Sequence, residues 1–152
     1  MLGTAAILGE IRGLLKANDD RAAKARGVAE VIRRSRNYRW VGIYEIGAEE
    51  IAALGWTGEE APKYPQFPAS QGLCGAAARA GTPVLVGDVT KDPRYLTTFS
   101  STRSEMIVPI MRLTTGRPIG LIDVESERVN AFGEKDGSFL ENCAEALTAL
   151  WD

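Results

Sequence analysis

The sequence predicts an α+β fold, in which a central antiparallel sheet is flanked by N-terminal and C-terminal helices. Two patterns predict it. Apolar residues recur at helical spacing at both ends of the chain, whereas the middle alternates short β-branched and aromatic runs with turns. The length of 152 residues suits one domain, residues 1–152, with a hydrophobic core of its own.

Two helices are expected at the N-terminus. Residues 4–17 carry a helical apolar stripe, with Thr4 as the candidate N-cap. The polar run at 18–20 interrupts this stripe, and a second stripe then continues to about Arg34. Both segments contain glycine, which lowers helix stability, so we expect packing against the rest of the domain to hold them.

Strands follow the helices. Residues 38–46 are rich in aromatic and β-branched side chains, and residues 51–56 return as the hairpin partner. Residues 57–72 contain three prolines and are expected to form a long loop with one short strand near Phe67. Long loops inside a compact domain are often functional, so this segment is a candidate border of a site.

A short helix and a second hairpin complete the sheet. An alanine-rich helix begins at Gly72 and Gly81 closes it at the C′ position. We then expect a buried strand at 84–86 and a second loop over 88–103. The remaining elements are strands at 105–112 and 118–125 and a final helix at 134–150.

The second hairpin determines which acidic residues face one another. A three-residue loop at 114–116, with glycine in the left-handed position, would pair Leu113 with Arg117. The same register places Glu105 opposite Glu125. A two-residue turn would shift the register by one residue and disperse this pair.

Asp123 joins this pair because side chains alternate along a strand, so it shares a face with Glu125 and lies opposite Ile107. Opposed like charges destabilise a sheet, so such a cluster must raise a pKa, bind a cation or lie open to water. The functional interpretation is a pocket for an ammonium or amidinium group, with a hard metal ion as the less favoured guest. The alternative is that Arg103 pairs with Glu105 and water solvates the rest.

The composition excludes several classes of protein. No histidine is present, which excludes histidine-activated nucleophiles and histidine-ligated metals. The net charge of −2 gives no field that attracts nucleic acid or an anionic membrane. Two cysteines indicate a reducing compartment, and neither a signal segment nor a membrane-spanning run is evident. We expect a cytoplasmic protein with no cofactor, metal or nucleic-acid partner.

The two cysteines have different predicted roles. Cys74 lies where a glycine-bracketed loop enters a helix, and free N–H groups there would lower its pKa, which makes it a candidate nucleophile. The alternative is a small buried thiol. Cys143 falls in the apolar stripe of the last helix and is expected in the core. A bridge between the two thiols stays open, although a reducing compartment disfavours it.

Two aromatic residues are candidate cavity walls. Trp40 and Tyr44 are four residues apart on one strand and therefore face the same way, with Gly42 leaving space between them. Such walls can hold an apolar or cationic group. The alternative is that both rings are ordinary core residues.

Several segments, in this order, resemble the GAF domain family and, within it, the free methionine-R-sulfoxide reductases. The resemblance covers about residues 5–150. Its carriers are Trp40-Val41-Gly42-Ile43-Tyr44, Gly72-Leu73-Cys74-Gly75, Val86-Gly87-Asp88-Val89, Ser104-Glu105-Met106-Ile107-Val108-Pro109 and Ile119-Gly120-Leu121-Ile122-Asp123-Val124-Glu125-Ser126.

The resemblance implies a pocket that binds free methionine sulfoxide on one face of the sheet. Its aromatic wall falls on Trp40 and Tyr44, and its acidic residues fall on Glu105, Asp123 and Glu125. The last of these positions is usually Asp in the family, so this pocket differs slightly. The resemblance therefore agrees with the cluster inferred from the register.

The catalytic cysteines of the reductases are not all present. The resemblance implies three thiols, of which this chain retains Cys74; Thr98 stands at the nucleophile position and Tyr64 at the other upstream position. A threonine hydroxyl neither attacks a sulfoxide as a thiolate does nor forms a disulfide afterwards. The chain is similar to these reductases but lacks two of their three cysteines.

We therefore expect a small-molecule-binding or sensing domain for an amine-bearing, amino-acid-like ligand, without catalysis. Residues 62–73 and 89–103 would cover the pocket, and the N-terminal helices are candidates for a homodimer interface. The alternatives are a remodelled reductase that uses Cys74 and a dimerisation or regulatory module. The expected ligand-binding residues are Trp40, Tyr44, Thr98, Glu105, Asp123 and Glu125.

Overall fold

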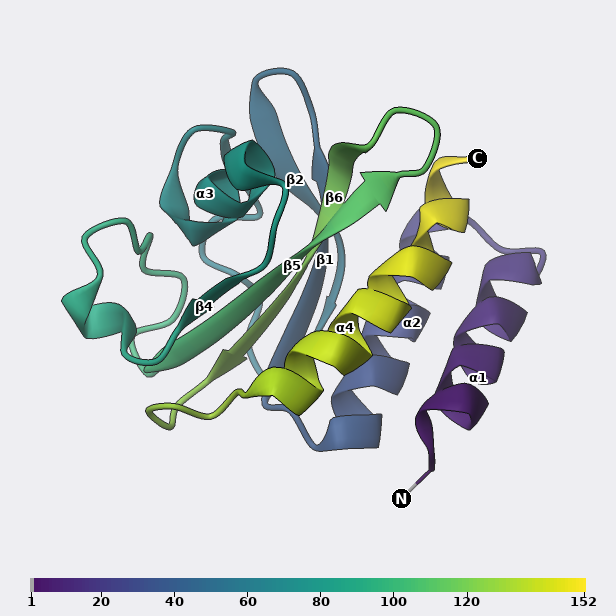
Figure 1. The fold of residues 1–152 in the computed structure, drawn as a ribbon, viewed down its shortest axis with the longest axis horizontal. Coiled ribbons are helices and arrows are strands. Elements are labelled where there is room, and N and C mark those ends of the chain that lie inside the picture. The colour runs from purple at the N-terminus through teal and green to yellow at the C-terminus, as the bar shows by residue number, and fades with distance from the viewer. Residues whose placement is uncertain (1) are drawn as a thin grey trace.

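One antiparallel sheet with helices on both sides forms the framework of the computed structural model, which describes residues 2–152 (Figure 1). The strand order is β3-β2-β1-β6-β5-β4, so the last hairpin lies in the middle of the sheet. The strands are β1 (Trp40–Ile46), β2 (Glu50–Thr57), β3 (Gln66–Pro68), β4 (Val84–Val86), β5 (Ser104–Arg112) and β6 (Arg117–Ser126). The predicted α+β fold with an antiparallel sheet is confirmed.

The helices lie close to their predicted positions. They are α1 (Thr4–Lys16), α2 (Arg21–Arg36), α3 (Gly72–Ala80) and α4 (Glu134–Leu147). Short 3₁₀ turns, η1 (Val89–Lys91) and η2 (Thr148–Trp151), follow β4 and α4. None of the described helices combines the length and the apolar character needed to cross a membrane.

The helix ends show why these boundaries arise. Gly3, not Thr4, occupies the N-cap position of α1, so the predicted cap is wrong by one residue. The Asp20 carboxylate caps α2 by accepting a hydrogen bond from the backbone N–H of Ala23 at 2.7 Å. That helix runs two residues past the predicted end because Asn37, at φ 55°, closes it in the left-handed conformation.

The two faces of the sheet are covered differently (Figure 1). Helices α1, α2 and α4 lie together on one face, whereas α3 and the chain that follows β4 lie on the other. The first face buries a continuous apolar cluster that includes Ile7, Val28, Ile122, Val124 and Leu140. A smaller cluster under α3 includes Trp40, Tyr44 and Cys74. The sheet therefore separates two cores.

The hairpin of β5 and β6 has the predicted register at its acidic end, although its turn differs from the predicted one. Glu105 lies opposite Glu125, which confirms the predicted pairing. At the turn, however, Arg112 and not Leu113 pairs with Arg117, so the loop is longer than predicted. A register shift between Ile110 and Met111 compensates for the longer loop. The acidic end of the hairpin is thereby returned to the predicted alignment.

Candidate functional site

Three carboxylates meet on the face of the sheet that α3 covers. Glu105 projects from β5, and Asp123 and Glu125 project from the neighbouring β6. Their exposed fractions are 4%, 3% and 0%. Acidic side chains are rarely buried to this extent without a partner, so the cluster is the most unusual feature of the sheet.

No basic side chain neutralises these acids. Arg103 is exposed, and its guanidinium donates to the backbone oxygens of Ser100 and Thr102 at 3.1 and 3.0 Å. The expected alternative, in which Arg103 pairs with Glu105, is wrong: no ion pair found over residues 2–152 includes any of the three acids. Asp123 Oδ1 and Glu125 Oε2 are also buried without a hydrogen-bond partner.

Burial and mutual repulsion make these groups hard to ionise. The pKa of Glu105 is raised well above its usual range by burial and then by the charge of Glu125. The pKa of Asp123 is raised by burial and by Glu105, and that of Glu125 by burial and by Asp123. The cluster therefore retains protons unless a cation replaces them.

A small cavity of about 20 Å³ is lined in part by the cluster. A water molecule needs roughly 10–15 Å³ of such space, so the cavity in this form admits one guest of about that size. Its walls come from β1, α3, the strands of the acids and both of the loops predicted to cover the pocket. The lining residues are Tyr44, Phe67, Gly72, Leu73, Cys74, Tyr95, Leu96, Thr98, Glu105 and Asp123.

The predicted pair of aromatic walls is only partly found. Tyr44 lines the cavity, and its ring contacts Phe67 edge to face at 6.0 Å. Trp40 does not line it, and no space remains above Gly42, because a Cβ atom there would lie 2.5 Å from the Trp40 ring and 2.8 Å from the Tyr44 ring. The two rings therefore close the predicted gap themselves.

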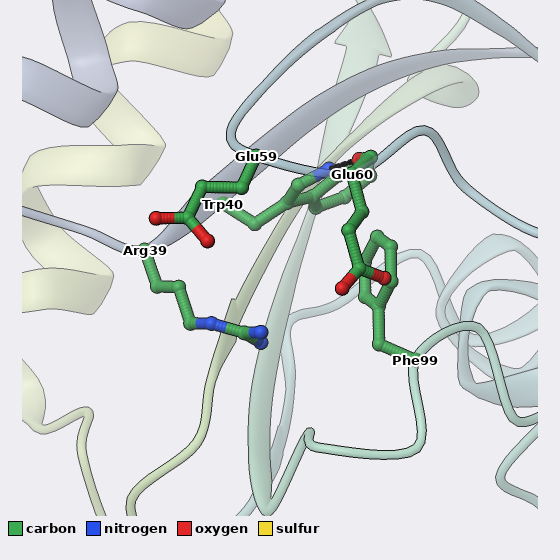
Figure 2. Close-up of a pocket in the computed structure, with 5 residues that line it drawn as sticks. All are labelled: Arg39, Trp40, Glu59, Glu60 and Phe99. Atoms are coloured by element: carbon green, nitrogen blue, oxygen red, sulfur yellow. Dashed lines mark hydrogen bonds between the residues drawn. The ribbon is translucent and has the colours of Figure 1, made fainter.

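Trp40 instead faces a second, smaller hollow (Figure 2). Its indole N–H donates to the backbone oxygen of Glu60 at 3.1 Å, and its ring packs against Phe99 at 5.2 Å. Arg39 and Glu59 complete the lining of a space of only about 10 Å³. The hydrogen bond from Trp40 to Glu60 thus ties the segment after β2 to the sheet.

Cys74 lies in the first turn of α3 and borders the acids. Its pKa is raised well above the usual thiol range, first by burial and then by the charges of Asp123 and Glu105. The expectation that the helix N-terminus lowers this pKa is wrong, because burial and the carboxylates outweigh the helix. Cys143 packs in the opposite core, as predicted, and both thiols are free, so no bridge joins them.

Two further residues connect the loop over 89–103 to the site. Thr98 lines the cavity, as the alignment with the reductases implies, and its hydroxyl donates to the backbone oxygen of Leu96 at 3.4 Å. Tyr95 was not among the predicted residues, yet its hydroxyl lies 3.4 Å from Glu125 Oε1. No local pattern marks Tyr95, since only the path of this loop brings it to the cluster.

Comparisons with known proteins give one family. The GAF domain profile matches residues 20–149. GAF domain-containing protein A of Dictyostelium discoideum is 29% identical over 93% of this chain and 87% of its own length. The free methionine-R-sulfoxide reductase of Saccharomyces cerevisiae is 32% identical over 71% of this chain and 60% of its own length.

The same fold is found in a solved enzyme. The X-ray structure of free methionine-R-sulfoxide reductase from Neisseria meningitidis, in complex with its substrate, matches with a TM-score of 0.85 and 29% identity. The match covers 97% of this chain and 87% of that chain. The similarity therefore includes the sheet, its helices and the segments that surround the acidic cluster.

Proposed function

The chain belongs to the GAF domain family, and on that basis we propose that it binds an amine-bearing, amino-acid-like small molecule beside Glu105, Asp123 and Glu125. The proposal rests mainly on one observation: three carboxylates are buried together, and no ion pair among residues 2–152 offsets their charge. An ammonium group would provide the missing positive charge and a donor for the unpartnered Asp123 Oδ1, while the nearby Glu125 carboxylate would add to the negative charge that attracts it.

The N-terminus of α3 provides the complementary half of an amino-acid site. Gln71, the N-cap residue, makes no side-chain hydrogen bond to the helix, so the first N–H groups of α3 are left without that partner. Gly72 and Leu73 of this turn line the same cavity as Glu105 and Asp123. Free N–H groups at a helix N-terminus bind carboxylates, so a zwitterion with separated charges fits better than a simple amine.

Entry of such a ligand requires the loops to move. A cavity of about 20 Å³ is far below the several hundred Å³ typical of a small-molecule site. Part of its lining comes from Phe67 of β3 and from Tyr95, Leu96 and Thr98 of the loop over 89–103. In our proposal these loops open to admit the ligand and close over it, which is the usual role of mobile segments at such sites.

We further propose that binding is not followed by sulfoxide reduction. Reducing a sulfoxide to a thioether and water takes two electrons, which a reductase obtains by oxidising two thiols to a disulfide. Here Thr98 stands at the implied nucleophile position and the Cys74 thiol is held protonated. Cys143 lies in the other core and cannot resolve an intermediate on Cys74 without unfolding. In this proposal the domain binds its ligand without changing it, which is the behaviour of a sensing domain.

Calorimetry and thermal shift test the binding proposal. The probes are L-methionine, L-methionine (R)-sulfoxide and spermidine, each with its fully N-acetylated form as a matched control that carries no ammonium group. At 100 times its Kd, a ligand stabilises the folded protein by about 2.7 kcal/mol. We expect one of the free amines to raise the melting temperature of the wild-type protein. Its acetylated form should cause no shift, and the free amine should cause none in the Glu105→Gln variant.

A matched variant controls for charge. Glu141 is exposed on α4, so Glu141→Gln removes one negative charge without touching the site and should leave binding intact. The proposal fails if acetylated and free ligands bind equally well, or if no probe binds the wild-type protein. Thioredoxin-coupled turnover of methionine sulfoxide that disappears in Cys74→Ser would overturn the non-catalytic part and favour the remodelled reductase.

The predicted homodimer through α1 and α2 stays a proposal of the same kind. Both helices present exposed residues on their outer faces, and Leu2 is 59% exposed beside them. Sedimentation at several concentrations tests it. A monomer at all concentrations would leave ligand binding, rather than assembly, as the function of this domain.

A further inference from the structure

Donor atoms of two kinds converge on the cavity. The Cys74 sulfur and one carboxylate oxygen each from Glu105 and Asp123 all lie within 4.8 Å of one another. The three residues come from α3, β5 and β6, so three separate elements aim their side chains at one point. All three side chains are buried, and Asp123 Oδ1 has no hydrogen-bond partner among the described residues. The arrangement has the form of an incomplete coordination shell.

The size of the cavity restricts what completes that shell. A space of about 20 Å³ is too small for an amino acid but admits a single ion or a water molecule. No lysine or arginine reaches the acids within residues 2–152, so no protein cation competes for the position. A small cation is therefore the guest that matches both the volume of this cavity and the charge of its acidic lining.

The donor set selects among cations. One thiolate and two carboxylates suit a borderline-soft ion such as Zn²⁺, whereas Mg²⁺ and Ca²⁺ take oxygen ligands only. We propose that this small cavity binds Zn²⁺, or a divalent cation of similar softness, through Cys74 Sγ, Glu105 and Asp123, in competition with the amine ligand. Glu125 does not line the cavity, but it shares the face of β6 with Asp123, so its negative charge would stabilise the dication electrostatically.

Binding exchanges protons for metal. The thiol must lose its proton to become a ligand, and the carboxyls lose whatever protons they hold, so the affinity rises with pH. The charge of the ion reverses the local electrostatics that otherwise keep Cys74 protonated. No electron is transferred, and the products are the metal complex and free protons.

Titration of the full chain with Co²⁺ after chelator treatment tests the site directly. A cobalt–thiolate bond gives a charge-transfer band in the near ultraviolet. We expect this band to saturate at one equivalent and to disappear when Zn²⁺ is added. Cys74→Ala should abolish the band, whereas Cys143→Ala, which removes the other buried thiol, should retain it. A band that depends on Cys143 instead would overturn the proposal.

X-ray absorption of the zinc-loaded wild-type protein avoids variants altogether, in case a substitution unfolds the domain. We expect one sulfur and otherwise oxygen ligands; no sulfur, or no binding at micromolar zinc, would refute the site. The inference uses carboxylates of the proposed amine site but does not depend on it. Amine binding measured with chelator present and zinc binding measured without amine can each fail alone, which separates the two proposals.

Discussion

β6 carries both kinds of chemistry found in this protein. Its residues Ile122 and Val124 point into the core beneath α1, α2 and α4, whereas Asp123 and Glu125 point towards α3. Alternation along one strand thus supplies an apolar face and an acidic face within four residues. Both faces are buried, so the difference lies in what each face gains from burial.

The two faces have opposite effects on stability. The helix-covered face removes a continuous apolar cluster from water, which favours folding in proportion to the buried area. The acidic face buries three ionisable groups without counter-charges, which opposes folding at any pH where they ionise. The comparison indicates that the apolar face supplies the stability that offsets the cost of burying three unpaired carboxylates on the other face.

The largest effect is expected on the apolar face. Ile122 is fully buried there, so Ile122→Ala should lower the free energy of unfolding by about 2–5 kcal/mol through lost transfer energy and a cavity. Urea denaturation followed by far-ultraviolet circular dichroism measures it. A loss below about 1 kcal/mol would mean that this core collapses around the cavity and is less rigid than the comparison requires.

The next effect concerns the packing of the aromatic rings on the acidic face. Gly42→Ala places a Cβ atom 2.5 Å from the Trp40 ring and should cost about 1–3 kcal/mol through overpacking. Gly13→Ala in α1 is the matched control, because nothing lies within 4 Å of its Cβ; it should stabilise the helix. Equal effects of the two substitutions would show that space remains between the rings.

A smaller effect of opposite sign is expected at the acids. Glu105→Gln keeps the shape of the side chain but removes a buried charge whose pKa is raised, so it should raise the free energy of unfolding at pH 8. The expected gain is on the order of 1 kcal/mol, the usual size of a single-residue effect. Denaturant titration in parallel with the binding assay measures both results. Destabilisation at pH 8 would show that the carboxylate already has a partner.

The raised pKa values also predict how the stability of the protein changes with pH. The pKa values of Glu105, Asp123 and Glu125 are raised on folding, so the folded state holds more protons than the unfolded state above the ordinary carboxyl pKa. Stability without a ligand should therefore be greatest below that pKa and should fall as the pH rises through the raised values. Glu105→Gln should reduce this slope. A bound cation should also reduce it.

The smallest effect is expected at Arg103. Its guanidinium is exposed and bonds only to nearby backbone oxygens, so Arg103→Ala should change stability by less than about 0.5 kcal/mol and leave the pH slope unchanged. A larger effect, or a steeper slope, would show that Arg103 offsets the acids in solution and would remove the contrast between the two faces.

Local patterns predicted much of the fold but not all of its details. The left-handed position of Gly81, at φ 67°, ends α3 as expected, because a residue without a Cβ adopts it without strain. The pairing of Glu105 with Glu125 was also predicted, although the hairpin reaches it through the irregularity near Met111. Such irregularities depend on packing against both faces and leave no clear trace in the sequence.

The site was less predictable than the fold because it depends on contacts between distant segments. Tyr95 reaches Glu125 only through the path of its loop. Trp40 does not line the cavity, and its ring packs instead against Phe99 and the segment after β2. The pKa of Cys74 was predicted in the wrong direction, since the helix N-terminus is visible in the sequence but complete burial beside Asp123 is not.

The sequence by itself determined that Glu105, Asp123 and Glu125 share one face of a sheet, because period-two alternation and hairpin pairing are local properties of the chain. Only the tertiary structure decided that these acids are enclosed and unpaired. Enclosure requires α3 and the loop over 89–103 to pack across the sheet, and the absence of a counter-charge requires Arg103 to turn towards solvent. Both are outcomes of long-range packing, in which the whole fold competes for each contact.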